Sequence, residues 1–362
     1  MYSLYVYDPA LIRVGIVESI TSLQWLDYYQ DAGEVKLVCA ATAQNLALLH
    51  DGYRLYNTEE TTAAVIVNTL LEDDGTAPKL TVRALLSVAL LDRRVVMGTV
   101  QVSNVETAMR FMIQQNSRGL AIAPGESAGL TAQLNTQISW GSVLEAEKTL
   151  AKASGLGFRV LFDPASAAET FEVYTGTDRT AGNGYNGYFG DDIGNLSSVK
   201  LETGSEDYCN IAVVAGAGEG NARKVLFTGS AGEEERRELY VDARDIEQVY
   251  QTASDTGEID ENGNPVIEYT ETSYTEAEYS AKLEARGIEK LSEVPRVHSV
   301  SAQVEQGSMQ YRHDYWLGDI VPLKLSAYGI RIRARVSGIK IIYEGTGKQV
   351  ITMLSEVQEE QI

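Results

Sequence analysis

The chain has 362 residues, and its 51 acidic against 30 basic side chains give a formal net charge of −21 at pH 7. A chain of this length is expected to form about two to four folded modules, and its negative field disfavours a general binder of nucleic acids or anionic membranes. The only thiols, Cys39 and Cys209, are too few for a disulfide framework or a thiolate metal site and fit synthesis in a reducing cytoplasm.

The first hundred residues predict short β-strands joined by turns. Val35, Leu37 and Cys39 alternate with their neighbours at the period of a pleated strand. Further strands are expected at 53–57, 61–71 and 79–84, with a turn at 72–75. No basic segment followed by an apolar run opens the chain, and no apolar stretch approaches the roughly 18 residues of a membrane span. Several short strands favour a barrel or a sandwich.

The middle of the chain changes to a helical period. Ser103 with Glu106 predicts a capping box, and the apolar positions from 105 to 113 repeat at helical spacing. Ser142 with Glu145 opens a second helix, which is expected to end near Gly155. A hairpin should follow, with strands at 158–162 and 171–173 and a turn at 163–164. Residues 175–195 hold too many glycines for regular structure and predict a long loop.

The second half is again rich in predicted strands. They are expected at 199–203, 211–215, 225–228 and 239–241. The stretch 251–273 is polar and acidic, with Asn262-Gly263 as the tip of a hairpin. A helix follows from Thr275, capped with Glu278, and ends near 294–295.

The last segment has the clearest alternation in the chain. A three-strand meander is expected over 330–336, 339–343 and 349–354, with turns at Ser337-Gly338 and at 345–347. Within it, Arg331, Arg333 and Arg335 share one strand face. This basic row is either a solvated outer face or an interface that docks an acidic neighbour through arginine–carboxylate pairs.

No residues indicate catalysis, a cofactor or a metal site. His50, His298 and His313 lack a nucleophile signature and metal-ligand spacing. The glycines at 216–220 follow a predicted strand but precede another strand, so a turn is favoured over a phosphate-binding loop. The oxygen-rich stretch 255–264 lacks the glycine placement of a calcium loop, and we interpret it as a solvated hairpin.

Several segments together resemble one protein family. They are 13–18, 22–25, 28–38, 173–179, 210–220, 237–245, 314–321 and 335–344, with Arg286-Gly287 and Leu291 on the last helix. In this order the chain resembles the siphovirus tail-hub family of phage minor structural or tail proteins, which is similar to the baseplate hub of contractile phages. The likeness covers nearly the whole chain.

The resemblance implies an α+β, β-rich fold with two small β-barrels flanking a mixed middle domain. The first barrel is expected at 1–98, the middle domain at 99–195 plus 245–294, the second barrel at 196–244 plus 295–354, and a tail at 355–362. It further implies a structural, non-enzymatic homotrimer in the virion tail, at the baseplate or tip. Its expected partners are the distal tail, tape-measure and tail-tip or fibre proteins, without sequence-specific nucleic-acid binding or membrane insertion.

Two other functions fit the same residues. A glycan-binding or glycan-degrading tail component could use Trp25, Trp140 and Trp316 as stacking platforms, although these positions also suit a core. A hub from a phage-derived bacteriocin would be physically the same part in another device.

Overall fold

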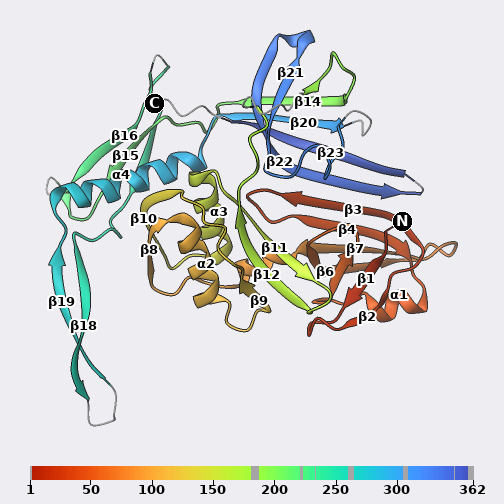
Figure 1. The fold of residues 1–362 in the computed structure, drawn as a ribbon, viewed down its shortest axis with the longest axis horizontal. Coiled ribbons are helices and arrows are strands. Elements are labelled where there is room, and N and C mark those ends of the chain that lie inside the picture. The colour runs from red at the N-terminus through yellow and green to blue at the C-terminus, as the bar shows by residue number, and fades with distance from the viewer. Residues whose placement is uncertain are drawn as a thin grey trace.

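A computed structural model describes residues 2–180, 187–220, 223–232, 234–259, 265–304, 309–345 and 347–357. Within these ranges the fold is β-rich, and its largest element is a sheet of thirteen strands. Figure 1 shows this sheet beside a helical middle region, with a smaller sheet and a long hairpin beyond it. None of the described helices is long and apolar enough to cross a membrane.

One part of the large sheet comes from the N-terminal strands, in the order β3-β4-β7-β6-β5-β1-β2. Their bounds are β1 Leu4–Tyr7, β2 Arg13–Ile16, β3 Ile20–Tyr28, β4 Glu34–Ala40, β5 Arg54–Asn57, β6 Ala63–Glu72 and β7 Lys79–Leu86; α1 covers Ala43–Leu48 and a 3-10 helix Ser87–Arg93. Alternation forms these strands, since Val35, Leu37 and Cys39 of β4 are all buried. The strands predicted here are confirmed.

The other part of the sheet comes from the C-terminal strands, in the order β14-β20-β23-β22, with β21 on β22 and β13 on β21. Their bounds are β13 Phe189–Gly190, β14 Leu196–Gly204, β20 Val297–Val304, β21 Ile320–Leu325, β22 Ile330–Glu344 and β23 Gly347–Glu356; a second 3-10 helix covers Ser326–Tyr328. Antiparallel pairing of β22 with β3 joins the two parts. The N-terminal and C-terminal strands thus lie side by side in one sheet (Figure 1).

The described strands do not close into a barrel. Strand β2 pairs only with β1, β14 only with β20 and the short β13 only with β21, so the large sheet ends in three free edges. The β-rich class is confirmed, and the two-barrel arrangement stays a prediction. Strands 211–242, assigned to the second barrel from the sequence, form a sheet of their own instead, because their apolar side packs on a helix and not on the large sheet.

The predicted meander differs at one turn. Strand β22 continues through Ser337-Gly338 as a single strand of 15 residues, with a register shift between Val336 and Gly338. The prediction of a turn there is wrong. Gly338 serves close packing, since a Cβ at this position would lie 2.9 Å from the ring of Tyr28 on the neighbouring strand. The turn at 345–347 is confirmed by the pairing of Glu344 with Gly347.

The middle region holds two helices and two small sheets. Its elements are β8 Thr99–Asn104, α2 Val105–Asn116, β9 Ile122–Pro124, β10 Gln133–Ser139, α3 Val143–Ser154, β11 Gly157–Asp163 and β12 Ala168–Tyr174. Ser142 caps α3, and Gly155 ends it in the left-handed conformation at φ 72°, as predicted. The cap predicted for α2 is wrong. Asn104, not Ser103, accepts from the Thr107 N–H, and the Glu106 carboxylate accepts from the 127–130 loop.

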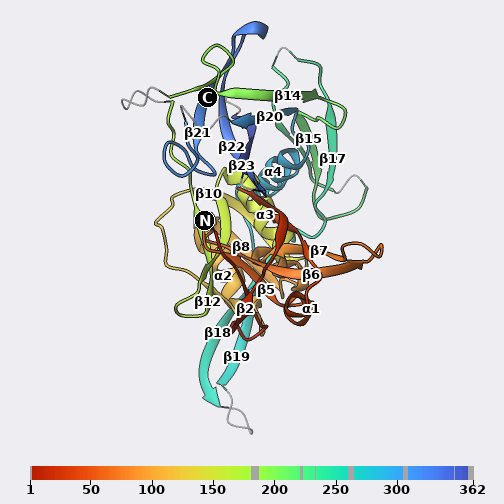
Figure 2. The ribbon, with the colours of Figure 1, turned by 90° about the vertical axis from the view of Figure 1, so that its right-hand side faces the viewer.

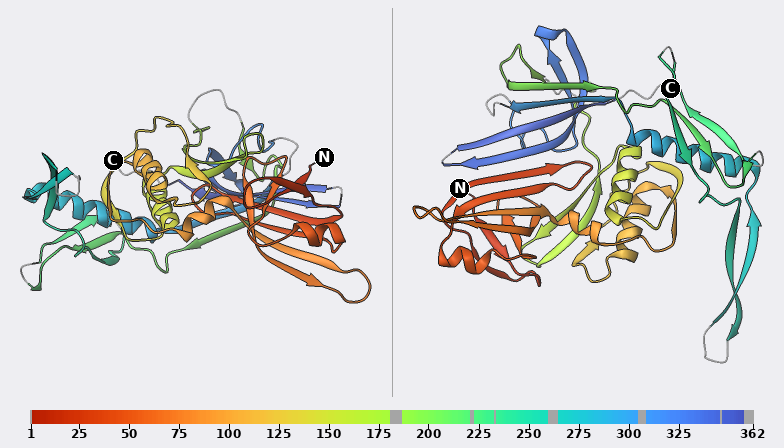
Figure 3. Two further views of the ribbon diagram at one scale, coloured as in Figure 1. Left: turned by 90° about the horizontal axis from the view of Figure 1, so that it is seen from below. Right: turned by 180° about the vertical axis from the view of Figure 1, so that it is seen from behind.

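A separate module carries a projecting hairpin. Its sheet contains β15 Ile211–Ala215, β16 Val225–Gly229 and β17 Glu238–Asp242, and helix α4 Glu276–Glu293 packs against it; β18 Val249–Ile259 pairs with β19 Pro265–Ser273. The capping box of Thr275 with Glu278 starts α4, as predicted. Figures 2 and 3 show β18 and β19 extending away from the rest of the molecule. The predicted tip at Asn262-Gly263 lies outside the described residues.

Candidate assembly surfaces

The histidines lie apart in the structure and form no common site. His50 and His313 are on the surface, where His313 Nδ1 lies 2.9 Å from the Asp314 carboxylate. The side chain of His298 is outside the described part of the structure. Among the described residues, no group of three or more His, Cys, Asp or Glu side chains is placed to hold a metal ion.

The three tryptophans occupy different environments. Trp25 is fully buried in the large sheet, whereas Trp140 and Trp316 are 66% and 43% exposed. The Trp316 ring lies under the Arg179 guanidinium, 5.0 Å from its carbon. Trp25 is thus a core residue, and the exposed rings come from separate parts of the fold, the turn between β10 and α3 and the segment before β21. The glycan-binding alternative stays a prediction.

The arginine row on β22 is largely engaged within the chain. Arg333 forms an ion pair with Asp178 at 2.6 Å and donates to the Thr180 hydroxyl. Arg335 donates to the Gly318 carbonyl at 2.9 Å and lies over the Tyr29 ring. Of the three arginines, Arg331 is exposed and the other two are half-buried. The structure therefore leaves Arg331 for an external partner, whereas Arg333 holds the 175–180 segment and Arg335 contacts Gly318 and Tyr29.

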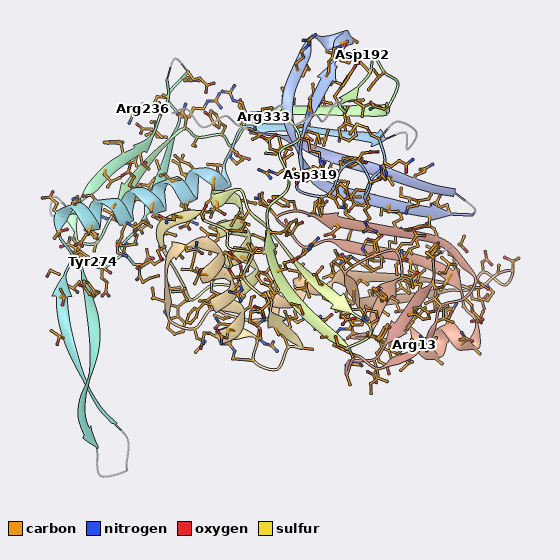
Figure 4. The ribbon with its side chains drawn as sticks, viewed as in Figure 1. Arg13, Asp192, Arg236, Tyr274, Asp319 and Arg333 are labelled. Atoms are coloured by element: carbon orange, nitrogen blue, oxygen red, sulfur yellow. The ribbon has the colours of Figure 1, made fainter. Side chains whose placement is uncertain are left out.

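Two sequence segments far apart in the chain meet at Asp319. Its carboxylate accepts from the Thr177 N–H at 2.8 Å, from Arg179 Nε at 2.6 Å and from the Trp316 N–H at 2.9 Å. Only 3% of the Asp319 side chain is exposed, so these three donors compensate a desolvated charge. Figure 4 places Asp319 and Arg333 together, where the chain leaving β12 crosses the C-terminal strands. Asp319 thus fixes the 177–179 segment against the 316–319 segment.

The backbone is tightly packed at the same crossing. A Cβ on Gly176 would lie 2.0 Å from the carbonyl oxygen of Gly318. Gly318 itself has φ 94°, a conformation that glycine adopts without strain. Both glycines are therefore required by the contact between the segments, a role that the sequence alone did not reveal.

Buried ion pairs connect the large sheet to the middle region. Arg54 of β5 donates from Nη2 to Glu169 of β12 at 3.0 Å, and both side chains are almost fully buried. Ser87 also donates to the Glu169 carboxylate. Glu60 is buried against Arg312, and this pair ties the 58–62 turn to the loop before β21. These contacts fix the relative positions of segments that no strand pairing joins.

Two further carboxyl groups have pKa values raised by burial. Desolvation, with a smaller contribution from the Glu60 charge, raises the pKa of Asp27 to about 7. Glu147 on α3 is fully buried, neither of its oxygens has a hydrogen-bond partner, and desolvation raises its pKa well above the ordinary value. Raised carboxyl pKa values often mark catalytic sites. Glu147 lies on the side of α3 that is buried in the apolar core, where its uncompensated burial lowers stability.

The outer face of the small sheet is apolar. Phe227 and Tyr240 flank Val213 in register, and each ring is 61% exposed on the side away from α4. The Arg236 guanidinium lies over the Phe227 ring, and Arg223 donates to the Tyr240 hydroxyl. Figure 4 shows Arg236 at the outer end of this module. Exposed aromatic rings with arginines are typical of protein–protein contact surfaces.

A second exposed surface, which we call the Trp140 patch, lies between the first 3-10 helix and β8. It contains Arg93, Arg94, Val95, Met97, Arg118 and Trp140. Val95, Met97 and Trp140 are 46%, 61% and 66% exposed. No pattern in the sequence predicts this patch, because its residues are up to 47 positions apart in the chain. The one available signal was Arg93-Arg94 next to an apolar run that no predicted strand used.

A family model and several solved structures match nearly the whole chain. The family model described as Siphovirus ReqiPepy6 Gp37-like protein matches residues 3–353. A search of curated proteins gives no match.

Three solved structures share the fold over nearly their full length, each at 11% sequence identity. The tail protein from Neisseria meningitidis MC58 has a TM-score of 0.55, with 98% of this chain and 96% of that chain covered. The 43 kDa tail protein of prophage MuSo2 from Shewanella oneidensis has a TM-score of 0.57, covering 97% and 98%. Prophage tail protein gp18 from Listeria monocytogenes EGD-e has a TM-score of 0.52, covering 99% and 95%.

Proposed function

Because this chain belongs to the family of Siphovirus ReqiPepy6 Gp37-like proteins, we propose that it is a structural hub subunit of a phage or prophage tail tip. In this role, copies of the chain form a ring that joins the tail tube or distal tail ring to the tip or fibre proteins. The ring is a homotrimer at the baseplate end of the virion tail. Its partners are the distal tail protein, the tape-measure protein and the tail-tip or fibre proteins.

The observation that carries the proposal is the open large sheet. Its edge strands β2 and β14 each have one free side among the described strands. Beside β2, Ile12, Val14 and Ile16 are between 40% and 63% exposed. An exposed apolar strand edge promotes uncontrolled pairing unless another chain covers it. A ring of copies covers such edges by a closed set of contacts, which avoids open-ended growth.

The sheet also supports an arrangement with two units in each subunit. The N-terminal strands and the C-terminal strands are two groups related by the single β22–β3 pairing. We propose that each group is one barrel-like unit, so that three subunits present six positions around the ring. The first unit corresponds to the barrel expected at 1–98. The second combines β14 with the strands after 295, and the 205–244 part of the predicted barrel belongs to the separate module.

The role is mechanical and needs no catalytic residue, cofactor or metal ion. What it needs is a rigid body that keeps its shape under load, and the buried pairs at Glu169 and Asp319 provide this within the subunit. Arg331 remains a proposed contact for an acidic neighbour. The change Arg331→Gln is expected to weaken assembly and leave the unfolding free energy within about 0.5 kcal/mol. An unchanged assembly would remove Arg331 from the interface.

The proposal is tested by the mass of the purified protein. Native mass spectrometry at micromolar concentration should give three times the 39.5 kDa mass of the chain. Antibodies against the chain should label purified virions at the tail tip. A chain that remains monomeric at all concentrations and labels no part of the tail would contradict the hub role.

A further inference from the structure

The Trp140 patch is held outward by strained backbone. Trp140 has φ 50° and Arg118 has φ 33°, left-handed values that cost side chains other than glycine about 1 kcal/mol each. Strand pairing places Trp140 beside Met97, between the pairs Val95–Ser142 and Thr99–Ser139. This strained backbone lowers the stability of the subunit, while it holds a large apolar side chain in contact with solvent. A binding partner for Trp140 would account for both features.

The arginines of the patch have no acidic partner. Arg94 donates to the carbonyls of Ser117 and Arg118, and Arg118 donates to the Val95 carbonyl at 2.7 Å. Within the described part of the chain, Arg93, Arg94 and Arg118 form no ion pair, although the chain carries 51 acidic residues. Arg93 and Arg94 precede the exposed Met97 in the chain, and Arg118 reaches the same segment through the Val95 carbonyl. The Asp92 carboxylate beside them accepts from the Ser142 hydroxyl. Tryptophan and arginine are the residue types that most often dominate binding energy in protein interfaces.

The hairpin β18–β19, which we call the arm, has the opposite character. Its 25 residues from 249 to 273 contain six acidic side chains and no Lys or Arg. Each described arm strand pairs only with the other, and β18 alone extends over about 35 Å. A two-stranded hairpin without a third strand or a helix against it is marginally stable in water. Among the described strands, none of the rest of the chain pairs with the arm.

The arm and the patch of one chain lie at opposite ends of α4. The arm joins α4 at its N-terminal end, through Ser273 and Thr275. Gly141 and Ser142, beside Trp140, line a groove of about 430 Å³ with Arg286, Glu289 and Glu293 from the C-terminal half of α4. Figures 1 and 3 show the arm directed away from the body. The arm of one copy is thus placed to reach another copy rather than its own patch.

We propose that the Trp140 patch of one subunit binds the acidic arm of a neighbouring copy of this chain. The sequence of the arm supplies carboxylates with which the arginine forks of the patch can pair. The contact adds a clasp to a ring, so the inference rests on the proposed function and names one of its interfaces. Opposite charges on two surfaces of the same chain favour a copy as the partner.

The test uses charge reversal in the full-length protein. The patch variants are Arg93→Glu with Arg118→Glu and, separately, Trp140→Asn; the arm variant is Glu268→Lys with Glu271→Lys. Each should weaken self-association at least about tenfold, as measured by sedimentation equilibrium at low salt. The unfolding free energy of Trp140→Asn alone should not fall, since asparagine tolerates the left-handed conformation better. Arg83→Glu, an exposed reversal on β7, is the control and should associate like the wild type.

A combined variant tests the pairing itself. A chain with Arg93→Glu, Arg118→Glu, Glu268→Lys and Glu271→Lys should regain most of the association that the patch or the arm reversal loses. If the patch variants and the arm variant each associate as strongly as the wild type, the clasp is overturned and the hub role still stands. Loss of association from the patch variants without loss from the arm variant also overturns it, because the patch then binds another surface. A wild-type chain that never associates overturns both.

Discussion

The body of the molecule and the projecting arm show two ways of using β-strands. In the body, both parts of the large sheet share one continuous apolar core, which includes Trp25, Phe158 and Tyr315. The described strands of the arm pair only with each other, and the Tyr250 and Tyr274 rings, 4.7 Å apart between centroids, lie at its base (Figure 4). The body is stabilised within one chain. For the arm and the Trp140 patch we propose a stabilising contact with a second chain.

The largest effect in this comparison is expected where the body is held by buried charge. Glu169→Ala leaves the guanidinium of Arg54 buried without its carboxylate and should lower the free energy of unfolding by about 3–5 kcal/mol. Urea denaturation measures this loss. The exposed pair Arg83–Glu34 is the matched control, since Glu34→Ala should cost about 1 kcal/mol or less. Similar losses from both changes would mean that the body does not depend on its buried pairs.

A smaller effect is expected at the crossing of the 175–180 segment. Asp319→Ala removes the acceptor of three donors and should cost about 2–3 kcal/mol in the same assay. Asp178→Ala, which breaks the more exposed pair with Arg333, should cost about 1 kcal/mol or less. Equal costs for the two would show that the crossing is held by its glycine packing and not by Asp319.

The buried carboxyl group of Glu147 should make the stability of the body depend on pH. Folding raises the pKa of Glu147, so above its ordinary pKa of 4.5 the unfolded state releases a proton that the folded state keeps. Stability from this group is therefore complete below pH 4.5 and is lost as the pH rises toward the folded pKa. Glu147→Met should stabilise the protein by about 1–2 kcal/mol at pH 8, and the gain should shrink toward pH 4.5. Unfolding midpoints between pH 4 and pH 8 measure this difference. A gain independent of pH would contradict the assignment.

The smallest effect is expected in the arm. Replacing residues 251–272 with a short Gly-Ser linker keeps Tyr250, Tyr274 and the cap of α4, and should change the unfolding free energy of the body by less than about 0.5 kcal/mol. Self-association should weaken in the same variant. Calorimetry and sedimentation on one preparation separate the two outcomes. A body that loses several kcal/mol would show that the arm supports its own chain.

Local patterns predicted most of the elements because local chemistry determines them. Alternation located β4 and β22, and the capping box located the start of α4. The failures lie where distant residues decide. The continuation of β22 through Gly338 depends on the ring of Tyr28, about 310 residues earlier in the chain, and the cap of α2 depends on which of two adjacent polar residues reaches the helix N–H groups.

The candidate surfaces were less predictable than the fold. The row of Arg331, Arg333 and Arg335 was visible from the sequence, but only the structure shows that Asp178 and Gly318 occupy two of its members. The Trp140 patch combines segments that periodicity treats separately, and the free edges of β2 and β14 depend on the pairing order of the whole sheet. Such features arise from packing between residues that are far apart in the chain, which local patterns in a single sequence do not predict.

Cryo-electron microscopy of the purified chain tests the central claim most directly. The account predicts closed particles with three-fold symmetry, in which the edges of the large sheet meet between subunits and the arm of each subunit contacts its neighbour. Images that contain only single, separate subunits, with the β2 and β14 edges uncovered at every concentration, would contradict it.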